Sequence, residues 1–157
     1  MEKPTEAPRP VYVTGRWEMI LTGPNGEHKN TVRGKNVVVD NGLEKLCEFL
    51  SAANAAATTF TFGYIGIGTD ATSESSSDTD LGTELARHTG VVSYISNAIY
   101  QVKSTFAAGL GTGAIVEYGL FNSNTNGTLF SRDTESVINK GAGDTLTVTA
   151  QYTFSGS

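Results

Sequence analysis

The sequence predicts a mainly β protein: a jelly-roll-like sandwich or barrel of about eight strands, with one inserted helix and an extended N-terminal arm. Three observations support this fold class. Apolar and polar residues alternate over short runs along most of the chain. Turns rich in glycine, asparagine and threonine separate these runs, and glycine supplies 18 of the 157 residues. Only one segment has the apolar spacing of an amphipathic helix.

Residues 1–10 are predicted to form an extended arm. Pro4, Pro8 and Pro10 fix the backbone φ angle and have no N–H to donate, so this segment is expected to be extended. Two interpretations remain open at this point. The segment is either an unstructured tail, as chain termini often are, or an arm that lies on a neighbouring subunit.

Residues 11–39 are predicted to form a long β-hairpin. The turn is marked by Gly23-Pro24-Asn25-Gly26, and the return strand covers 31–39. A hairpin alone is marginally stable, so its apolar face is expected to pack on a neighbouring copy or another partner. The residues expected on that face are Val11, Val13, Trp17, Met19 and Leu21.

Residues 40–157 are predicted to form the sandwich core, beginning with a helix at about 41–56. Asp40 or Asn41 caps this helix. Its apolar face is formed by Leu43, Leu46, Cys47, Phe49 and Leu50, and Cys47 is expected to be a packed small hydrophobe. Residues 81–87 are interpreted as a short turn or helical segment. Strands are expected at about 60–67, 89–95, 98–107, 114–121, 128–138 and 145–154.

Composition restricts the partners and the chemistry. The net charge of −5, without a basic stripe, argues against nucleic acid and against an anionic membrane. A single cysteine allows no intramolecular disulfide. No apolar run reaches the length of a membrane span, and the N-terminus does not resemble a signal peptide, so synthesis in the cytoplasm is expected.

The chain lacks a recognisable catalytic motif, so we expect a protein that is not an enzyme and uses no cofactor or metal. His28 and His88 are far apart and have no carboxylate at a fixed spacing. The loop 70–80 is the one ambiguous segment, because its carboxylates could supply oxygen ligands to Ca²⁺ or could simply be solvated. These carboxylates belong to Asp70, Glu74, Asp78 and Asp80.

Four charged residues stand beside apolar neighbours: Glu84, Arg87, Glu117 and Arg132. A partly buried charge needs a partner, so a structural charge network is expected. Glu117 and Arg132 fall in adjacent predicted strands joined by a turn, and we predict that they pair or share a network with Glu84 and Arg87. The other interpretation is an ion pair with a neighbouring subunit.

Several segments together resemble a known protein family. They are 38–43, 65–69, 79–81, 117–121 and 127–130, together with Glu84, Arg87 and Arg132. This pattern resembles the capsid decoration, or cement, proteins of tailed bacteriophages, within a loose family of small phage virion β proteins. The resemblance covers about residues 35–155, and 11–34 look similar to the N-terminal region of the decoration proteins.

The resemblance implies a structural protein made in the cytoplasm of the host bacterium. It would bind the major capsid protein on the outer surface of the virion and stabilise the shell by clamping neighbouring capsid subunits. The functional unit would be a homotrimer, with a dimer as the alternative. The residues expected to contact the capsid are Pro4, Pro8, Arg9, Pro10, Tyr12 and Trp17.

An alternative function is a phage tail or fibre module that binds carbohydrate on the host surface. Such a module would display aromatic side chains on one exposed face. The candidates for that face are Trp17, Tyr64, Tyr94, Tyr100 and Tyr118.

Overall fold

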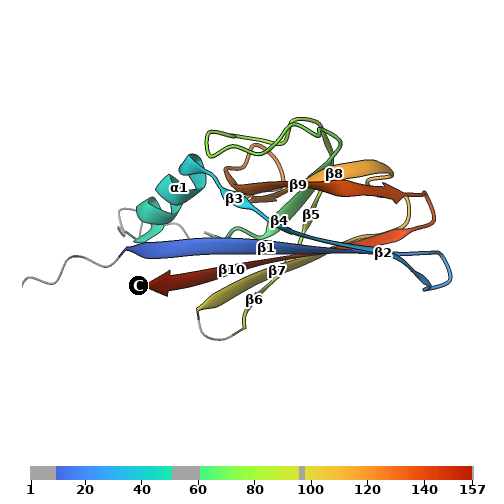
Figure 1. Cartoon of the computed structure of the whole chain (residues 1–157), viewed down its shortest axis with the longest axis horizontal. Coiled ribbons are helices and arrows are strands. Elements are labelled where there is room, and N and C mark those ends of the chain that lie inside the picture. Colours follow the sequence, from blue (N-terminus) through green and yellow to red (C-terminus); the bar gives the residue numbers. More distant parts are fainter. Residues whose placement is uncertain (1–9, 51–60, 96–97, 157) are drawn as a thin grey trace, which may run out of the picture.

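The computed structural model describes residues 10–50, 61–95 and 98–156, which form a β sandwich of two antiparallel sheets (Figure 1). The first sheet has the strand order β2-β1-β10-β7-β6, and the second has the order β3-β9-β8-β4-β5. The predicted β class is therefore confirmed, and the unclosed sheets make a sandwich instead of a barrel. The ten strands are β1 (Val11–Thr22), β2 (His28–Lys35), β3 (Val37–Val38), β4 (Tyr64–Gly68), β5 (Glu84–Thr89), β6 (Val91–Tyr94), β7 (Ile99–Phe106), β8 (Gly113–Phe121), β9 (Leu129–Lys140) and β10 (Thr145–Gly156).

The predicted N-terminal hairpin exists, but it is not a separate unit. β1 pairs with β2 through the turn after Thr22. On its other side β1 pairs with β10 along its whole length, from Val11 opposite Gly156 to Thr22 opposite Thr145. The hairpin thus belongs to the sandwich core, and the expectation that its apolar face packs on another subunit is wrong.

The core lies between the two sheets and is built by alternation along the strands. In β1 the side chains of Trp17 and Met19 point into the sandwich and are 1% and 0% exposed. The Trp17 ring lies 6.2 Å from the ring of Tyr118 in β8, measured between centroids. Phe130 in β9 meets Tyr152 in β10 edge to face at 5.0 Å. Burial of such large aromatic side chains from both sheets is the main force that holds the layers together.

Two nearly continuous strands pass from one sheet to the other and close the sides of the sandwich. β2 and β3 are separated by Asn36 alone, and β5 and β6 by Gly90 alone. At the second crossing the Gly90 amide donates to the carbonyl of Gly63 at 2.7 Å. Strands that change sheets form the corners of many sandwiches.

The outer face of the second sheet is covered by the loop 69–83 and by α1 (Asp40–Leu50) (Figure 1). Beneath this cover lies a second apolar cluster of Val39, Leu81, Phe121 and Leu129. The helix and the loop are joined, because the Asp40 amide donates to the carbonyl of Ser76 at 2.8 Å. The two segments therefore form one continuous surface on this side of the molecule.

Three local predictions need correction. Residues 84–87, expected in a turn or helical segment, are in strand β5, which pairs with β4. The helix spans Asp40–Leu50, and the last part of the predicted range, 51–56, lies outside the described residues. The predicted apolar helix face is largely exposed, with Leu50 at 73% and Cys47 also exposed, so Cys47 is not a packed core residue.

Candidate functional site

The charges singled out in the sequence form a buried ion pair at the centre of the second sheet. Glu117 in β8 and Arg132 in β9 are 0% and 3% exposed, and Arg132 Nη2 lies 3.0 Å from Glu117 Oε2. Arg132 Nε also donates to the same oxygen at 3.2 Å. The predicted pairing of these two residues is confirmed.

The Glu117 carboxylate also holds the loop 69–83 on the sheet. Its Oε1 accepts hydrogen bonds from the amides of Asp70 at 3.1 Å and Thr83 at 2.8 Å, and its Oε2 accepts one from the Gly82 amide at 2.9 Å. Hydrogen bonds from amides to a carboxylate are shorter and stronger than those between neutral groups. Through these three hydrogen bonds the Glu117 side chain anchors the loop on the sheet.

Arg132 extends this anchor to the acidic residues of the loop. Its Nη1 lies 3.1 Å from Asp78 Oδ2, and its Nη2 lies 3.9 Å from Asp70 Oδ2. Burial acts to lower the pKa of Arg132, but the hydrogen bonds to Glu117 and Asp78 outweigh it and raise the pKa above the ordinary value. The guanidinium therefore remains charged inside the protein.

The other two charges of the predicted network, Glu84 and Arg87, form a separate cluster on β5. Arg87 Nη2 lies 2.5 Å from Glu84 Oε2 and 3.4 Å from Asp80 Oδ1. The guanidinium carbon of Arg87 is 3.3 Å from the centre of the Phe121 ring, a cation–π contact. The four predicted charges thus form two structural clusters, both bound to the loop 69–83.

The candidate calcium loop uses its carboxylates for protein contacts. Asp70 accepts from the amide and hydroxyl of Thr72 at 2.9 and 2.8 Å, and Glu74 contacts the hydroxyl of Thr134. Asp78 and Asp80 bind the two buried arginines. Within the described part of the chain, no group of three or more histidine, cysteine or acidic side chains is arranged to hold a metal ion.

Of the residues predicted to contact a capsid, some lie outside the described residues, some are exposed and one is buried. Pro4, Pro8 and Arg9 lie outside the described residues. Pro10 is exposed, and Tyr12 is 52% exposed. Trp17 is 1% exposed inside the sandwich, so its assignment to a contact surface is wrong. The reason is the pairing of β1 with β10, which turns the odd-numbered side chains of β1 toward the second sheet.

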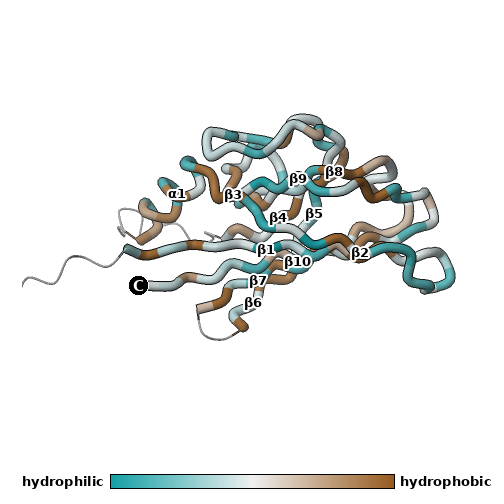
Figure 2. Tube along the Cα trace, viewed as in Figure 1, coloured by the Kyte–Doolittle hydropathy of each residue, from teal (hydrophilic) through white to brown (hydrophobic). Residues whose placement is uncertain are grey.

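A surface that sequence reasoning missed lies at one end of the sandwich, where β1 begins and β6 and β10 end. We call it the apolar end, and it consists of Val11, Tyr12, Phe49, Leu50, Tyr94 and Ile95. Each of these six side chains is between 47% and 76% exposed. Figure 2 shows hydrophobic colour on parts of α1 and on the ends of β6 and β7 at this side. Clusters of exposed large apolar side chains commonly mark interaction surfaces.

Next to the apolar end is a small hydrophobic hollow of about 290 Å³. Leu46 and Phe49 of α1 form one side, and Tyr100 and Phe154 of the first sheet form another. The hollow extends the apolar end into the space between the helix and the sheets. Its apolar lining adds to the exposed hydrophobic side chains of this end.

A second surface is the outer face of the first sheet, which we call the basic face. It carries Arg16, Arg33, Lys35 and Lys103, all exposed. Arg16 Nε donates to Gln151 Oε1 at 2.7 Å, and Gln151 donates in turn to Gln101 at 2.5 Å. Two shallow hollows of about 480 and 450 Å³ lie on this face and share Arg16 and Lys35.

A buried polar cluster in the core was also missed. Asp133 of β9 is 1% exposed, and both of its carboxylate oxygens lack a hydrogen-bond partner among the described residues, as do the Tyr118 hydroxyl and the Trp17 indole nitrogen. Burial, with the nearby charges of Glu135 and Glu74, raises the pKa of Asp133 to about 7. The strand β2 is close to it, since a Cβ at Gly34 would lie 2.5 Å from Asp133 Oδ2.

Comparisons with known proteins provide no relative: no family model, no curated protein and no solved structure matches this chain. None of the described helical residues forms a segment long and apolar enough to span a membrane. The function must therefore be inferred from the surfaces described above.

Proposed function

We propose that this chain is a virion structural protein that binds the outer surface of a bacteriophage capsid and stabilises the shell by clamping neighbouring capsid subunits. It would be made in the host bacterial cytoplasm and would act as a homotrimer, or alternatively as a dimer, on the major capsid protein. The observation that carries the proposal is the apolar end, which lies where the proline-rich N-terminal segment joins β1.

The position of this end supports a clamp. Pro10 is exposed and directly precedes Val11 and Tyr12, so residues 1–9 continue from the apolar end. An arm and an apolar patch at one place can contact two neighbouring subunits of a shell. Many copies acting together then resist rupture through multivalency, even where each contact is weak.

The buried charges support the same class of function. Glu117, Arg132 and Arg87 are fully engaged in holding the loop 69–83 on the second sheet. A firmly held loop gives a rigid body, which is useful in a clamp. The segments that resemble phage decoration proteins include these same residues.

The alternative of a carbohydrate-binding tail module has less support. Of the five aromatic residues considered for a sugar-binding platform, Trp17 and Tyr118 are 1% and 0% exposed, and Tyr64 and Tyr100 are partly buried. Tyr94 is the one with a largely exposed ring, at 76%. These five residues do not form one exposed aromatic face.

The test uses empty capsid shells and purified protein. Tyr94→Ser with Leu50→Ser should weaken shell binding by about tenfold or more, because buried aromatic anchors dominate interface energetics. Deletion of residues 1–10 should also weaken binding by about tenfold or more, without unfolding the sandwich. Val137→Ser is the matched control, since Val137 is 46% exposed on β9 and lies outside the apolar end. Unchanged binding of both the double variant and the deletion would refute the proposal.

A further inference from the structure

The charge of this molecule is divided between its two broad faces. The basic face carries four cations, and among the outward-facing residues of its described strands Glu18 is the one carboxylate. Glu18 already pairs with Arg33 at 2.7 Å. The net charge of the chain is nevertheless −5, so negative charge must be concentrated elsewhere.

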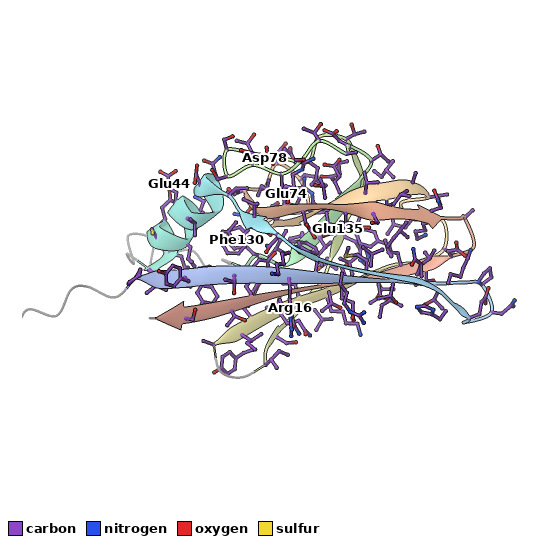
Figure 3. All side chains as sticks on the ribbon, viewed as in Figure 1. Arg16, Glu44, Glu74, Asp78, Phe130 and Glu135 are labelled. Atoms are coloured by element: carbon purple, nitrogen blue, oxygen red, sulfur yellow. The ribbon has the colours of Figure 1, made fainter. Side chains whose placement is uncertain are left out.

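The opposite side is acidic, and we call it the acidic face. It is formed by the loop 69–83, the start of β5 and α1, and it carries Glu44, Glu74, Asp78, Asp80 and Glu84. In Figure 3 the labelled Glu44, Glu74 and Asp78 lie on the side of α1 and the loop, whereas Arg16 lies on the side of β1 and β10. The two faces are separated by the thickness of the sandwich.

The arginines that pair with these acidic residues are buried, so they neutralise little of the negative charge at the surface of the acidic face. Arg132 and Arg87, which pair with the acidic residues, are 3% and 8% exposed in their side chains. The side chains of Asp80 and Glu84 are 67% and 30% exposed. A partner approaching this side therefore meets carboxylates, with the guanidinium groups beneath them.

We propose that the basic face of one copy docks on the acidic face of a second copy. The two surfaces carry opposite charge, and complementary charge orients two approaching copies and speeds their association. The inference rests on the self-association in the proposed function, but not on the binding of a shell. Because the two surfaces differ, the contact is head-to-tail and not a twofold dimer contact.

A head-to-tail contact has a geometric consequence for assembly. The apolar end lies along the strand direction, and the two charged faces point sideways from it (Figure 1). Copies that stand on their apolar ends would meet side by side, basic face to acidic face. Such contacts close into a ring when the rotation between neighbours permits, and otherwise they form a row.

The first test is the salt dependence of self-association of the wild-type protein, measured by sedimentation without shells. The screening length falls from about 10 Å at 0.1 M salt to about 3 Å at 1 M, so association should weaken by about tenfold or more. A monomer at both salt concentrations, or association that is unchanged or stronger at 1 M, would overturn the proposal.

The second test uses two charge-reversal variants. Lys35→Glu with Lys103→Glu reverses the basic face, and Glu44→Lys with Asp80→Lys reverses the acidic face. Each variant alone should associate about tenfold or more weakly, and their mixture should regain association, because each then meets a complementary surface. Absence of recovery in the mixture, with both variants folded by circular dichroism, would refute the head-to-tail contact.

A charge-matched control separates this contact from general repulsion. Four glutamates at exposed turn positions give the same change in net charge as the Lys35 and Lys103 reversals. The control positions are Asn25, Ala108, Asn124 and Thr125. The control should associate like the wild type. Loss of association in the control would assign the effect to net charge and reject the proposed surfaces. Shell binding measured separately distinguishes failure of this contact from failure of the proposed function.

Discussion

At the scale of single residues, the buried charges stabilise the fold, and the pairing of Glu117 with Arg132 could be predicted from the sequence. Glu117 and Arg132 were recognisable because charged residues stood in apolar strands joined by one short turn. Asp133 is next to Arg132 and more buried, yet the sequence could not identify it. Alternation places neighbours on opposite faces, and only the packing of β2 against β9 reveals that Asp133 points into the core.

Removal of the Glu117 carboxylate should strongly destabilise the fold. Glu117→Ala leaves the buried Arg132 without its main partner and releases the amides of Gly82 and Thr83, so a loss of about 3–5 kcal/mol is expected. Chemical denaturation measures this loss. Glu18→Ala is the control, because its exposed pair with Arg33 is worth about 1 kcal/mol or less. A Glu117→Ala protein as stable as the control would show that the pair contributes little.

The Asp133 carboxyl should make the fold more stable as the pH falls from 8 to 5. Its pKa is about 7 in the folded protein against an ordinary value of 3.8, so in this range the folded state takes up a proton that the unfolded state does not. Each unit of pH within that window favours folding by up to about 1.4 kcal/mol from this group.

The measurement is the free energy of unfolding across this pH range, with Asp133→Asn as the comparison. The variant should lack most of the pH dependence. The pKa values of Asp70 and Asp144 are lowered in the fold, so their contribution is lost only at more acidic pH and does not obscure the effect. Identical pH profiles for the variant and the wild type would contradict this account of Asp133.

At the scale of elements, the sequence predicted strand ranges better than it predicted strand partners. The ranges of β7 to β10 follow from alternation and turns and agree with the prediction to within a few residues, although β10 pairs with the distant strand β1. Residues 84–87 were expected in a turn or helical segment, but pairing with β4 makes them a strand. Trp17 was assigned to the correct strand but was wrongly expected on a contact surface. Its side chain is buried, because the strands that surround it come from residues far along the chain.

The close contact between α1 and β9 provides a test at this scale. A Cβ at Gly42 would lie 2.6 Å from the carbonyl oxygen of Phe130, which is backbone and cannot move aside easily. Gly42→Ala should therefore displace the helix and cost about 1–3 kcal/mol, despite the better helix propensity of alanine. Asn41→Ala, at the exposed neighbouring position, is the control for denaturation measurements. Equal or higher stability of Gly42→Ala would show that the helix is not held at this contact.

At the scale of the whole molecule, three surfaces have distinct properties: an apolar end, a basic face and an acidic face. None of them follows from a motif, since each combines residues from elements that lie apart in the sequence. The sequence predicts an N-terminal arm, most of which lies outside the described residues, and it contains no recognisable catalytic motif. Which side of each strand is exposed had to come from the fold. The proposed clamp assigns the apolar end to the shell and the two charged faces to neighbouring copies.

The central claim is that this protein covers the outer surface of a capsid in many copies, and its stoichiometry in purified phage particles tests that claim most directly. Quantitative mass spectrometry of particles that carry the protein gives its copy number relative to the major capsid protein. The account predicts hundreds of copies per particle, in a simple ratio to the major capsid protein. A handful of copies per particle would place the protein at the tail and contradict the account, as would its absence from the particles.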